Sequence, residues 1–448
     1  MEAPQIGAQA SVQVGRRRYL IGFMLMLVIG IAYVDRVNMS VAGPVLADQY
    51  QLSPKTLGLV YSSFYWGYAA TILLAGWLVD RHGKAIVLPI AVFIWTLISI
   101  TTCAVSSLAT LFGVRILLGF GEAPAYPSSN LIVREWSPLA ERGVFTSLMQ
   151  TGSLLGPGLA TAPAAYLVHH YGWRPSFVIL SSLGFLWLIA WLFIYRKPED
   201  ARWITDAERQ HILATRNIPH TGQSNHVAMS IGSLLKQRPM IGILLTNGPQ
   251  TYTLYLLLSW LPSYLTSSER KFNLVSSGFL TSAMFLVALI GAIMLGYISD
   301  RWLSLSQEQA HRGVRRRVVS TVMLLAMASV IATPWIMNEY LLVLVIAITL
   351  MMNTAAITLT YALTNDLIAD ESSAGRTFAM VSFAGQVIGL LAPAITGWIV
   401  GRENRYAPAF MLNALLLLLG SLAAWTLPNR RLQPVAEETK RRRDGETK

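Results

Sequence analysis

Residues 76–84 read GWLVDRHGK, and residues 296–301 read GYISDR. Both stretches share the pattern Gly-x-x-x-Asp-Arg, and each follows a long apolar run, the second and the eighth of the chain. The same turn therefore recurs six runs later, which predicts an internal repeat of two six-helix halves. The expected boundaries are 1–195 for the first half, 196–238 for a charged linker, 239–428 for the second half and 429–448 for a tail.

The composition indicates that lipid, rather than water, surrounds most of this chain. Of 448 residues, 54% are hydrophobic and 13% are charged, whereas a soluble domain has about 25% charged residues. A soluble enzyme, a secreted scaffold and a disordered chain are excluded. Runs of about 20 apolar residues can each cross a hydrocarbon core, and a β-barrel would show short alternating strands instead. We therefore predict an all-α membrane protein with twelve transmembrane helices, at residues 19–45, 56–79, 85–105, 108–133, 142–168, 175–195, 239–266, 274–299, 317–337, 340–366, 374–400 and 407–427.

The basic residues predict the orientation of these helices. On the side that carries both termini we count 27 Lys and Arg residues, against 6 on the opposite side. Cytoplasmic loops carry the excess of Lys and Arg, so both termini and the linker should be cytoplasmic. This topology explains the net charge of +12 without nucleic acid as a partner. The partner is the lipid bilayer, in a multi-pass protein of the cytoplasmic (inner) membrane.

Four ionisable side chains lie well inside the predicted helices: Asp35, Arg36, Arg115 and Glu122. A charge at the centre of a membrane helix costs at least about 2.5 kcal/mol and usually needs a partner. Arg115 and Glu122 are seven residues apart and share one helix face, so Arg115 is the expected charge partner of Glu122. Asp35 and Arg36 are adjacent and point about 100° apart, so one can face a cavity while the other meets a neighbouring helix.

The charge balance of this set suggests a mechanism. The four charges cancel when both carboxylates are ionised, and they sum to +2 when both are protonated. Protons and an anion would therefore favour each other's binding. The alternative is a permanent network of buried ion pairs that only holds helices together.

Specific motifs resemble a known family. The stretch 76–84 resembles the loop signature of the major facilitator superfamily. Residues 33–40, 115–127 and 198–208 are similar to the anion:cation symporter family within it. This resemblance implies the major facilitator fold and transport of a small organic anion together with protons. It implies proton handling by Asp35 and Glu122 and substrate binding by Arg36.

Further site residues follow from the same resemblance and from polar side chains inside the helices. The candidate substrate-binding residues are Tyr33, Tyr68, Gln150, Tyr361, Asn365 and Gln386, with Asn247, Gln250 and Asn353 as further cavity candidates. The alternative is that these polar groups only join helices. Sugar-acid members of the family commonly have tryptophan at the position of Tyr361 and asparagine at that of Gln386. A less hydroxylated aliphatic or aromatic acid is therefore favoured.

The repeated turn is a candidate gating motif. Its residues could form a latch with charges and helix ends on the cytoplasmic face, and the alternative is a solvated cluster that only sets topology. The gating residues are Gly76, Asp80, Arg81, Gly83, Lys84, Asp300 and Arg301.

The remaining features argue against other classes of protein. The single cysteine, Cys103, excludes a disulfide framework, and the seven histidines lack metal-ligand spacing, so we expect no metal and no cofactor. A membrane enzyme would need a nucleophile–base set, and a transporter-like sensor would need a large signalling domain. We find neither in the sequence. We predict a monomeric bacterial importer that couples organic anions to protons. The principal alternative is an organic-anion exchanger or exporter without net proton coupling.

Overall fold

The apolar runs form helices, and the turns between them fall at residues that suit turns. The computed structural model describes residues 15–216, 229–304, 311–368, 374–403, 405–428 and 430–432. Ser53 accepts a hydrogen bond from the backbone of Thr56 and so caps a helix that begins at Pro54. Gly83 has a φ of +85°, a conformation that favours glycine, and it ends one helix and begins the next.

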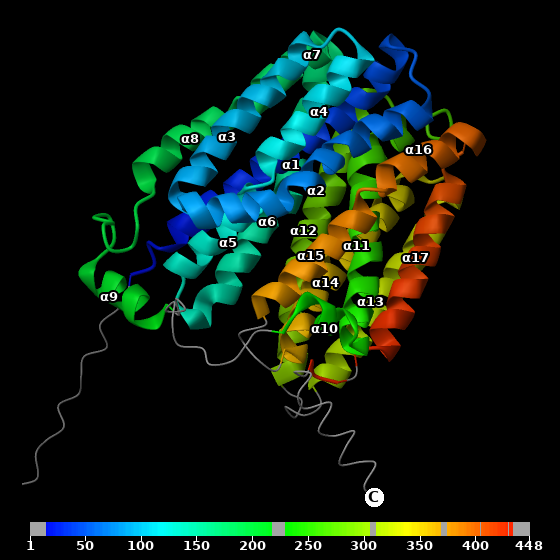
Figure 1. Cartoon of the computed structure of the whole chain (residues 1–448). Coiled ribbons are helices and arrows are strands. Elements are labelled where there is room, and N and C mark those ends of the chain that lie inside the picture. Colours follow the sequence, from blue (N-terminus) through cyan, green and yellow to red (C-terminus); the bar gives the residue numbers. More distant parts are fainter. Residues whose placement is uncertain are drawn as a thin grey trace, which may run out of the picture.

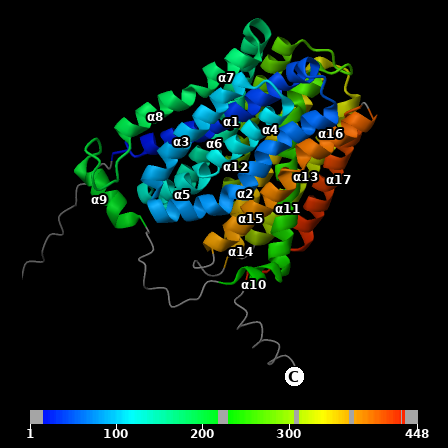
Figure 2. The ribbon, with the colours of Figure 1, turned by 45° about the horizontal axis from the view of Figure 1, so that its top comes forward.

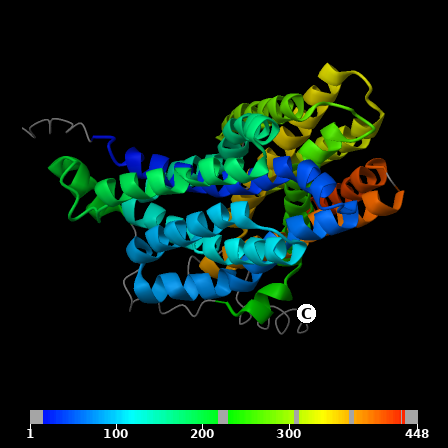
Figure 3. The same cartoon turned by 90° about the horizontal axis from the view of Figure 1, so that it is seen from above.

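The helices form two bundles, which Figure 3 shows side by side. The first bundle contains α1 (Tyr19–Gln49), α2 (Pro54–His82), α3 (Lys84–Thr101), α4 (Leu108–Glu122), α5 (Ala125–Trp136), α6 (Arg142–Tyr171), α7 (Trp173–Ser181) and α8 (Leu183–Ile194). The second contains α11 (Arg238–Thr266), α12 (Leu274–Ser304), α13 (His311–Ala332), α14 (Glu339–Leu367), α15 (Ala374–Gly389), α16 (Ala392–Glu403) and α17 (Ala407–Thr426). Between them lie the short helices α9 (Asp206–Thr215) and α10 (Ile231–Leu235).

These helices account for the twelve predicted spans. Three spans are broken in two: α4 with α5, α7 with α8, and α15 with α16. Among the described residues, nine helices are long and apolar enough to cross a membrane, or ten if a bent pair within α2 is counted as one span. The other two spans are α6 and α11, of 30 and 29 residues. Most of α11 is buried against other helices, so fewer of its residues need to suit lipid.

Close helix contacts depend on glycines at the centre of the first bundle. A Cβ atom on Gly152 of α6 would lie 2.2 Å from the carbonyl oxygen of Met26 on α1. A Cβ atom on Gly156 would lie 2.3 Å from the carbonyl oxygen of Gly30. Such small residues allow membrane helices to approach closely. They bring α1 into the interior, where most of its side chains are buried.

The linker residues around α9 pack on the end of the molecule at which α1 begins, which we call the linker end (Figure 1). Arg18 donates to Glu141 at 2.6 Å and to Glu208 of α9 at 3.0 Å. The hydrogen bond from Arg18 lowers the pKa of Glu141. Trp203 stacks on Trp136 with ring centroids 5.2 Å apart. The segment around α9 is therefore bound to the first bundle, whereas α10 lies beside the second (Figure 2).

The two bundles contact each other toward the opposite end, which we call the far end. The backbone N–H of Ala162 on α6 donates to Ser282 Oγ on α12 at 2.9 Å. Ser40 Oγ on α1 donates to the carbonyl oxygen of Ser259 on α11 at 2.8 Å. In Figure 1 the bundles approach each other at this end and diverge toward the linker end.

Another close contact between the bundles joins α2 and α16. A Cβ atom on Gly58 would lie 2.5 Å from the carbonyl oxygen of Pro393 and 3.0 Å from the Cα of Gly397. These distances leave no room for a side chain. The contact at the far end therefore requires glycine at this position of α2.

We predict that Gly58→Val opens the far end. Overpacking costs about 1–3 kcal/mol, and each 1.4 kcal/mol changes an equilibrium about tenfold. In a Cys103→Ser, Ser263→Cys background, Gly58→Val should raise the rate of labelling by a membrane-impermeant maleimide roughly tenfold. Gly113→Val is the matched control, because no atom of the described residues lies within 4 Å of a Cβ at Gly113. Equal rates in the two variants would contradict the prediction.

Candidate substrate site

A buried ion pair lies between the first and fourth spans. Arg36 of α1 donates to Glu122 Oε2 through Nη2 at 2.9 Å and through Nε at 3.2 Å. Arg36 is 6% exposed and Glu122 is fully buried. Glu122 is the last residue of α4, and Pro124 follows at the break before α5. Because proline cannot continue the hydrogen-bond ladder of α4, the break places this carboxylate at a helix end facing α1.

The partner of Glu122 is Arg36 and not Arg115, contrary to the sequence-based expectation. Residues seven positions apart on one helix are separated by about 10 Å along its axis. That spacing puts Arg115 and Glu122 on one face but beyond ion-pair distance. The Nε and Nη1 atoms of buried Arg115 have no hydrogen-bond partner in the described part of the chain.

One aromatic ring contacts both guanidinium groups. The Cζ atom of Arg36 lies 4.7 Å from the ring centroid of Phe64, and that of Arg115 lies 5.0 Å from it. Tyr33 and Tyr68 also lie against Arg36, with ring centroids 4.5 Å and 5.4 Å from its Cζ. Cation–π attraction of this kind is strongest where water is excluded. The rings therefore stabilise a positive charge that lipid would disfavour.

Asp35 points away from this pair, as its adjacency to Arg36 predicted. Its Oδ1 atom lies at hydrogen-bond distance from Ser99 Oγ of α3, at 2.6 Å, and from Ser181 Oγ of α7, at 2.7 Å. Asp35 is 1% exposed. Asp35 therefore meets neighbouring helices of its own bundle, whereas Arg36 faces the centre of the molecule.

The second bundle contributes a polar aromatic side to the site. Tyr255 of α11 stacks on Tyr65 of α2 across the two bundles, with ring centroids 4.2 Å apart. The Tyr255 hydroxyl donates to Gln386 Oε1 at 2.5 Å, and Tyr361 and Ser382 share a hydrogen bond of 3.1 Å. Phe64, Tyr65 and Tyr255 were not selected from the sequence. The cluster of aromatic residues at 64–68 was the available signal.

The other polar candidates are placed differently. Gln150 and Asn365 are exposed and make no contact with Arg36 among the described residues. Three buried amides join helices of the second bundle: Gln250 donates to Thr360 Oγ1 at 2.9 Å, and Asn353 and Asn247 donate to the backbone carbonyls of Gln250 and Val381. For these three the helix-joining alternative describes the observed contacts.

The first copy of the predicted gating motif lies at the linker end. Lys84 Nζ forms an ion pair with Glu135 Oε1 at 3.1 Å. Gly83 makes the turn between α2 and α3. Gly76 lies within α2, and a Cβ atom placed on it would meet no described atom within 4 Å. This copy therefore joins α3 to α5 within one bundle.

In the first copy of the motif, the charged side chains are exposed. Asp80 and Arg81 are exposed, and the Arg81 guanidinium lies 5.3 Å from the ring of Trp77. Asp80 has no ion-pair partner among the described residues. The side chains of Asp300 and Arg301 lie outside the described part of the chain. The latch between these copies stays a prediction.

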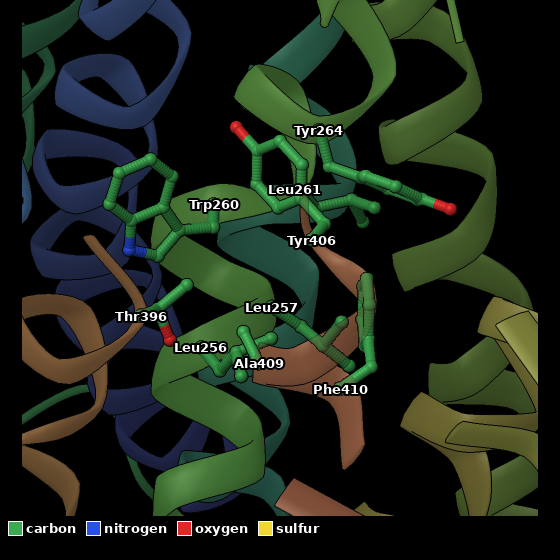
Figure 4. A pocket seen from close by; sticks show the side chains of 9 residues that line it. All are labelled: Leu256, Leu257, Trp260, Leu261, Tyr264, Thr396, Tyr406, Ala409 and Phe410. Carbon is green, nitrogen blue, oxygen red and sulfur yellow. The ribbon is translucent and has the colours of Figure 1, made fainter. Parts of the chain in front are cut away.

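A small cavity in the second bundle is separate from the charged site. Figure 4 shows the side chains around it, which include Trp260, Tyr264 and Phe410. Its volume is about 10 Å³ and its lining is almost entirely apolar. That volume holds at most one water, so this cavity is a packing defect and not a substrate site. No cluster of metal-ligating residues occurs among the described residues.

Fold and site together define a multi-pass membrane transporter with a buried cation at its centre. The chain belongs to the Major Facilitator Superfamily, whose family model matches residues 14–307 and 309–446. The structure resembles a crystal structure of a bacterial homolog to the human lysosomal transporter Spinster in an inward-facing and occupied conformation. The TM-score is 0.69 at 16% identity, over 92% of this chain and 97% of that one. The predicted fold is confirmed.

Relatives confirm the resemblance to the anion:cation symporter family. The D-galactonate transporter of Escherichia coli is 27% identical over 415 residues, which are 91% of this chain and 95% of that protein. The hexuronate transporter of Bacillus subtilis is 28% identical over 402 residues, 88% and 90% of the two chains. The chloroplastic ascorbate transporter of Arabidopsis thaliana is 28% identical over 422 residues, 92% and 74% of the two chains. These relatives are organic-acid transporters.

We predict that Phe64 and Arg115 are energetically coupled. Phe64→Leu removes the ring that contacts both guanidinium groups and leaves a cavity, which lowers stability by about 2–4 kcal/mol. In an Arg115→Gln background the same substitution should cost about 1 kcal/mol less, because one cation–π contact is already lost. Equilibrium unfolding of the four proteins in mixed micelles measures this coupling. Additive costs would contradict it.

Proposed function

We propose that this protein imports a small organic anion, a carboxylate, by proton symport through alternating access. The observation that carries the proposal is the ion pair of Arg36 and Glu122 at the centre of the molecule. One partner is a cation that an anionic substrate needs, and the other is a carboxylate that can accept a proton. We place the protein in the cytoplasmic membrane of a bacterium, with both termini inside.

The ion pair supports coupling between proton and anion. When Glu122 is ionised, it occupies the Nη2 and Nε donors of Arg36. Protonation of Glu122 weakens this charge-assisted bond and makes the guanidinium available for a carboxylate, which arginine binds in a bidentate manner. By linkage, the bound anion in turn favours protonated Glu122. Loss of the proton restores the ion pair and expels the anion.

The contacts between the bundles support alternating access. They lie toward the far end, at Ser40, Gly58 and Ala162, while the bundles diverge toward the linker end. With the positive-inside orientation, the bundles diverge on the cytoplasmic side and contact each other on the opposite side. Rocking of the halves 1–195 and 239–428 about the central site would expose it to the other side.

The substrate class follows from the groups that surround Arg36. The relatives transport D-galactonate, hexuronate and ascorbate, which supports an organic acid. In this chain, however, Gln386 is paired with Tyr255, and Tyr361 with Ser382. Tyr33, Phe64 and Tyr68 present ring faces beside the cation. A carboxylate with an apolar or aromatic body suits these groups better than a polyhydroxylated one.

Proton flux into proteoliposomes tests the proposed coupling. Addition of a transported acid without an imposed pH gradient should acidify the interior. Glu122→Gln and Asp35→Asn should each abolish this acidification and proton-driven accumulation, because a carboxyl that cannot ionise releases no proton. Some exchange of labelled substrate should survive. Glu141→Gln, at the linker end, is the control for loss of a carboxylate.

Two outcomes would contradict the proposal. Anion exchange with no proton flux in the unmodified protein would favour the exchanger. Normal accumulation by Asp35→Asn would remove this residue from the proton pathway. Folding of each variant is checked by size-exclusion chromatography, so that loss of flux is not confused with loss of protein.

The substrate class is tested with a panel of acids. We expect faster initial proton flux with aromatic and aliphatic carboxylates than with sugar acids. Gln386→Asn shortens the side chain by one methylene group and withdraws it from Tyr255, which makes both groups available to substrate hydroxyls. The ratio of sugar-acid flux to aromatic-acid flux should rise about tenfold. Asn247→Gln, in a buried helix-joining position, is a control, and an unchanged ratio in Gln386→Asn would contradict the assignment.

A further inference from the structure

Three oxygen atoms from three helices of the first bundle form a closed triangle around Asp35. Asp35 Oδ1 lies 2.6 Å from Ser99 Oγ and 2.7 Å from Ser181 Oγ, and the two serine oxygens lie 2.7 Å from each other. All three residues are at most 1% exposed. We call these three atoms the hydroxyl ring.

The number of hydrogen atoms in the hydroxyl ring depends on the state of Asp35. Each of the three contacts has the length of an O–H···O hydrogen bond, and each needs one hydrogen. Ser99 and Ser181 supply two. The third must come from the carboxyl group, so the closed triangle matches protonated Asp35. An ionised carboxylate would accept from both serines and leave the contact between them without a hydrogen.

Two further observations agree with this count. Asp35 Oδ2 is buried and has no hydrogen-bond partner in the described part of the chain, and an unpaired carboxylate oxygen is costly to bury. Oxygen ligands at about 2.1 Å around an octahedral Mg²⁺ ion lie about 3.0 Å apart. Contacts of 2.6–2.7 Å therefore fit shared protons and not a shared ion of this kind.

We propose that Ser99 and Ser181 are positioning residues that set the pH at which Asp35 exchanges its proton. A serine hydroxyl both donates and accepts. Around protonated Asp35 the three groups donate in a circle, and after the proton leaves, both hydroxyls turn to donate to the carboxylate. This inference rests on the proposed function, in which Asp35 carries a proton.

The position of the hydroxyl ring distinguishes it from the ion pair at the centre. Its helices, α1, α3 and α7, all belong to one bundle, so rocking between bundles does not break it. The charged groups that act on Asp35 are Arg115, Arg36 and Glu122. On α7, Arg174 bonds the backbone of Val105 at the far end, and on α3 the only charged residue, Lys84, lies at the linker end.

Removal of one hydroxyl should raise the pH of proton release. Hydrogen bonds to a carboxylate are stronger than those to a neutral carboxyl. Loss of one hydroxyl therefore destabilises ionised Asp35 more than protonated Asp35. The expected shift is roughly half a pH unit to one unit for each serine replaced by alanine. Ser99→Thr and Ser181→Thr keep the hydroxyl and should stay near the unmodified protein.

Infrared difference spectroscopy of the full chain in lipid nanodiscs measures this shift without substrate. The C=O stretching band of protonated carboxyl groups is followed as pH rises, and the component lost in Asp35→Asn is assigned to Asp35. Its midpoint should move upward in Ser99→Ala and Ser181→Ala. Ser129→Ala is the matched control, because Ser129 is buried on α5 and its hydroxyl has no hydrogen-bond partner among the described residues.

The possible results distinguish failure of the hydroxyl ring from failure of the proposed transport function. An unchanged midpoint in both alanine variants, or a titrating band that Asp35→Asn does not alter, would overturn the role of the hydroxyl ring. Upward shifts with rescue by threonine establish the role, even if no acid drives proton flux in proteoliposomes. In that last case the proposed function fails while the hydroxyl ring stands.

Discussion

Arg36 carries a positive charge inside a membrane-spanning bundle, and the rest of the structure accommodates this charge. A charge at such depth needs partners, which here are the Glu122 carboxylate and the rings of Tyr33, Phe64 and Tyr68. These partners come from three different spans. The glycine contacts that bring α6 against α1, and the break after α4, both serve to surround the same guanidinium.

The helices and the charged residues were predictable from sequence, because each depends on local information. Length of an apolar run, a glycine in a turn and a charge within a run are all visible along the chain. The partner of Glu122 was not predictable in this way. Heptad spacing identifies Arg115 as a neighbour on the same helix face, but the bond is made by Arg36 of α1, 86 residues away in the sequence. Spacing along one helix does not show which residues of other helices lie beside it.

The contacts of the polar residues in the second bundle were also not predictable from sequence. Gln250, Asn353 and Gln386 are alike as uncharged amides in apolar runs. In the structure, Gln250 and Asn353 join α11 to α14, while Gln386 bonds Tyr255 beside the central rings. Which partner each amide meets depends on how the helices pack, and the composition of an apolar run does not record that packing.

Asp35 and Arg36 are adjacent on α1 but lie in different surroundings. Asp35 is held by hydroxyl groups within its own bundle, and Arg36 is held by a carboxylate and rings at the centre, where the second bundle approaches through Tyr255. Consecutive side chains on a helix point about 100° apart, so one rigid element connects both sites. A movement of α1 relative to the other helices of its own bundle therefore acts on the contacts of both residues. Because Asp35 and Arg36 are consecutive on this helix, the hydroxyl groups at Asp35 and the Glu122 carboxylate at Arg36 are connected through α1 without direct contact between them.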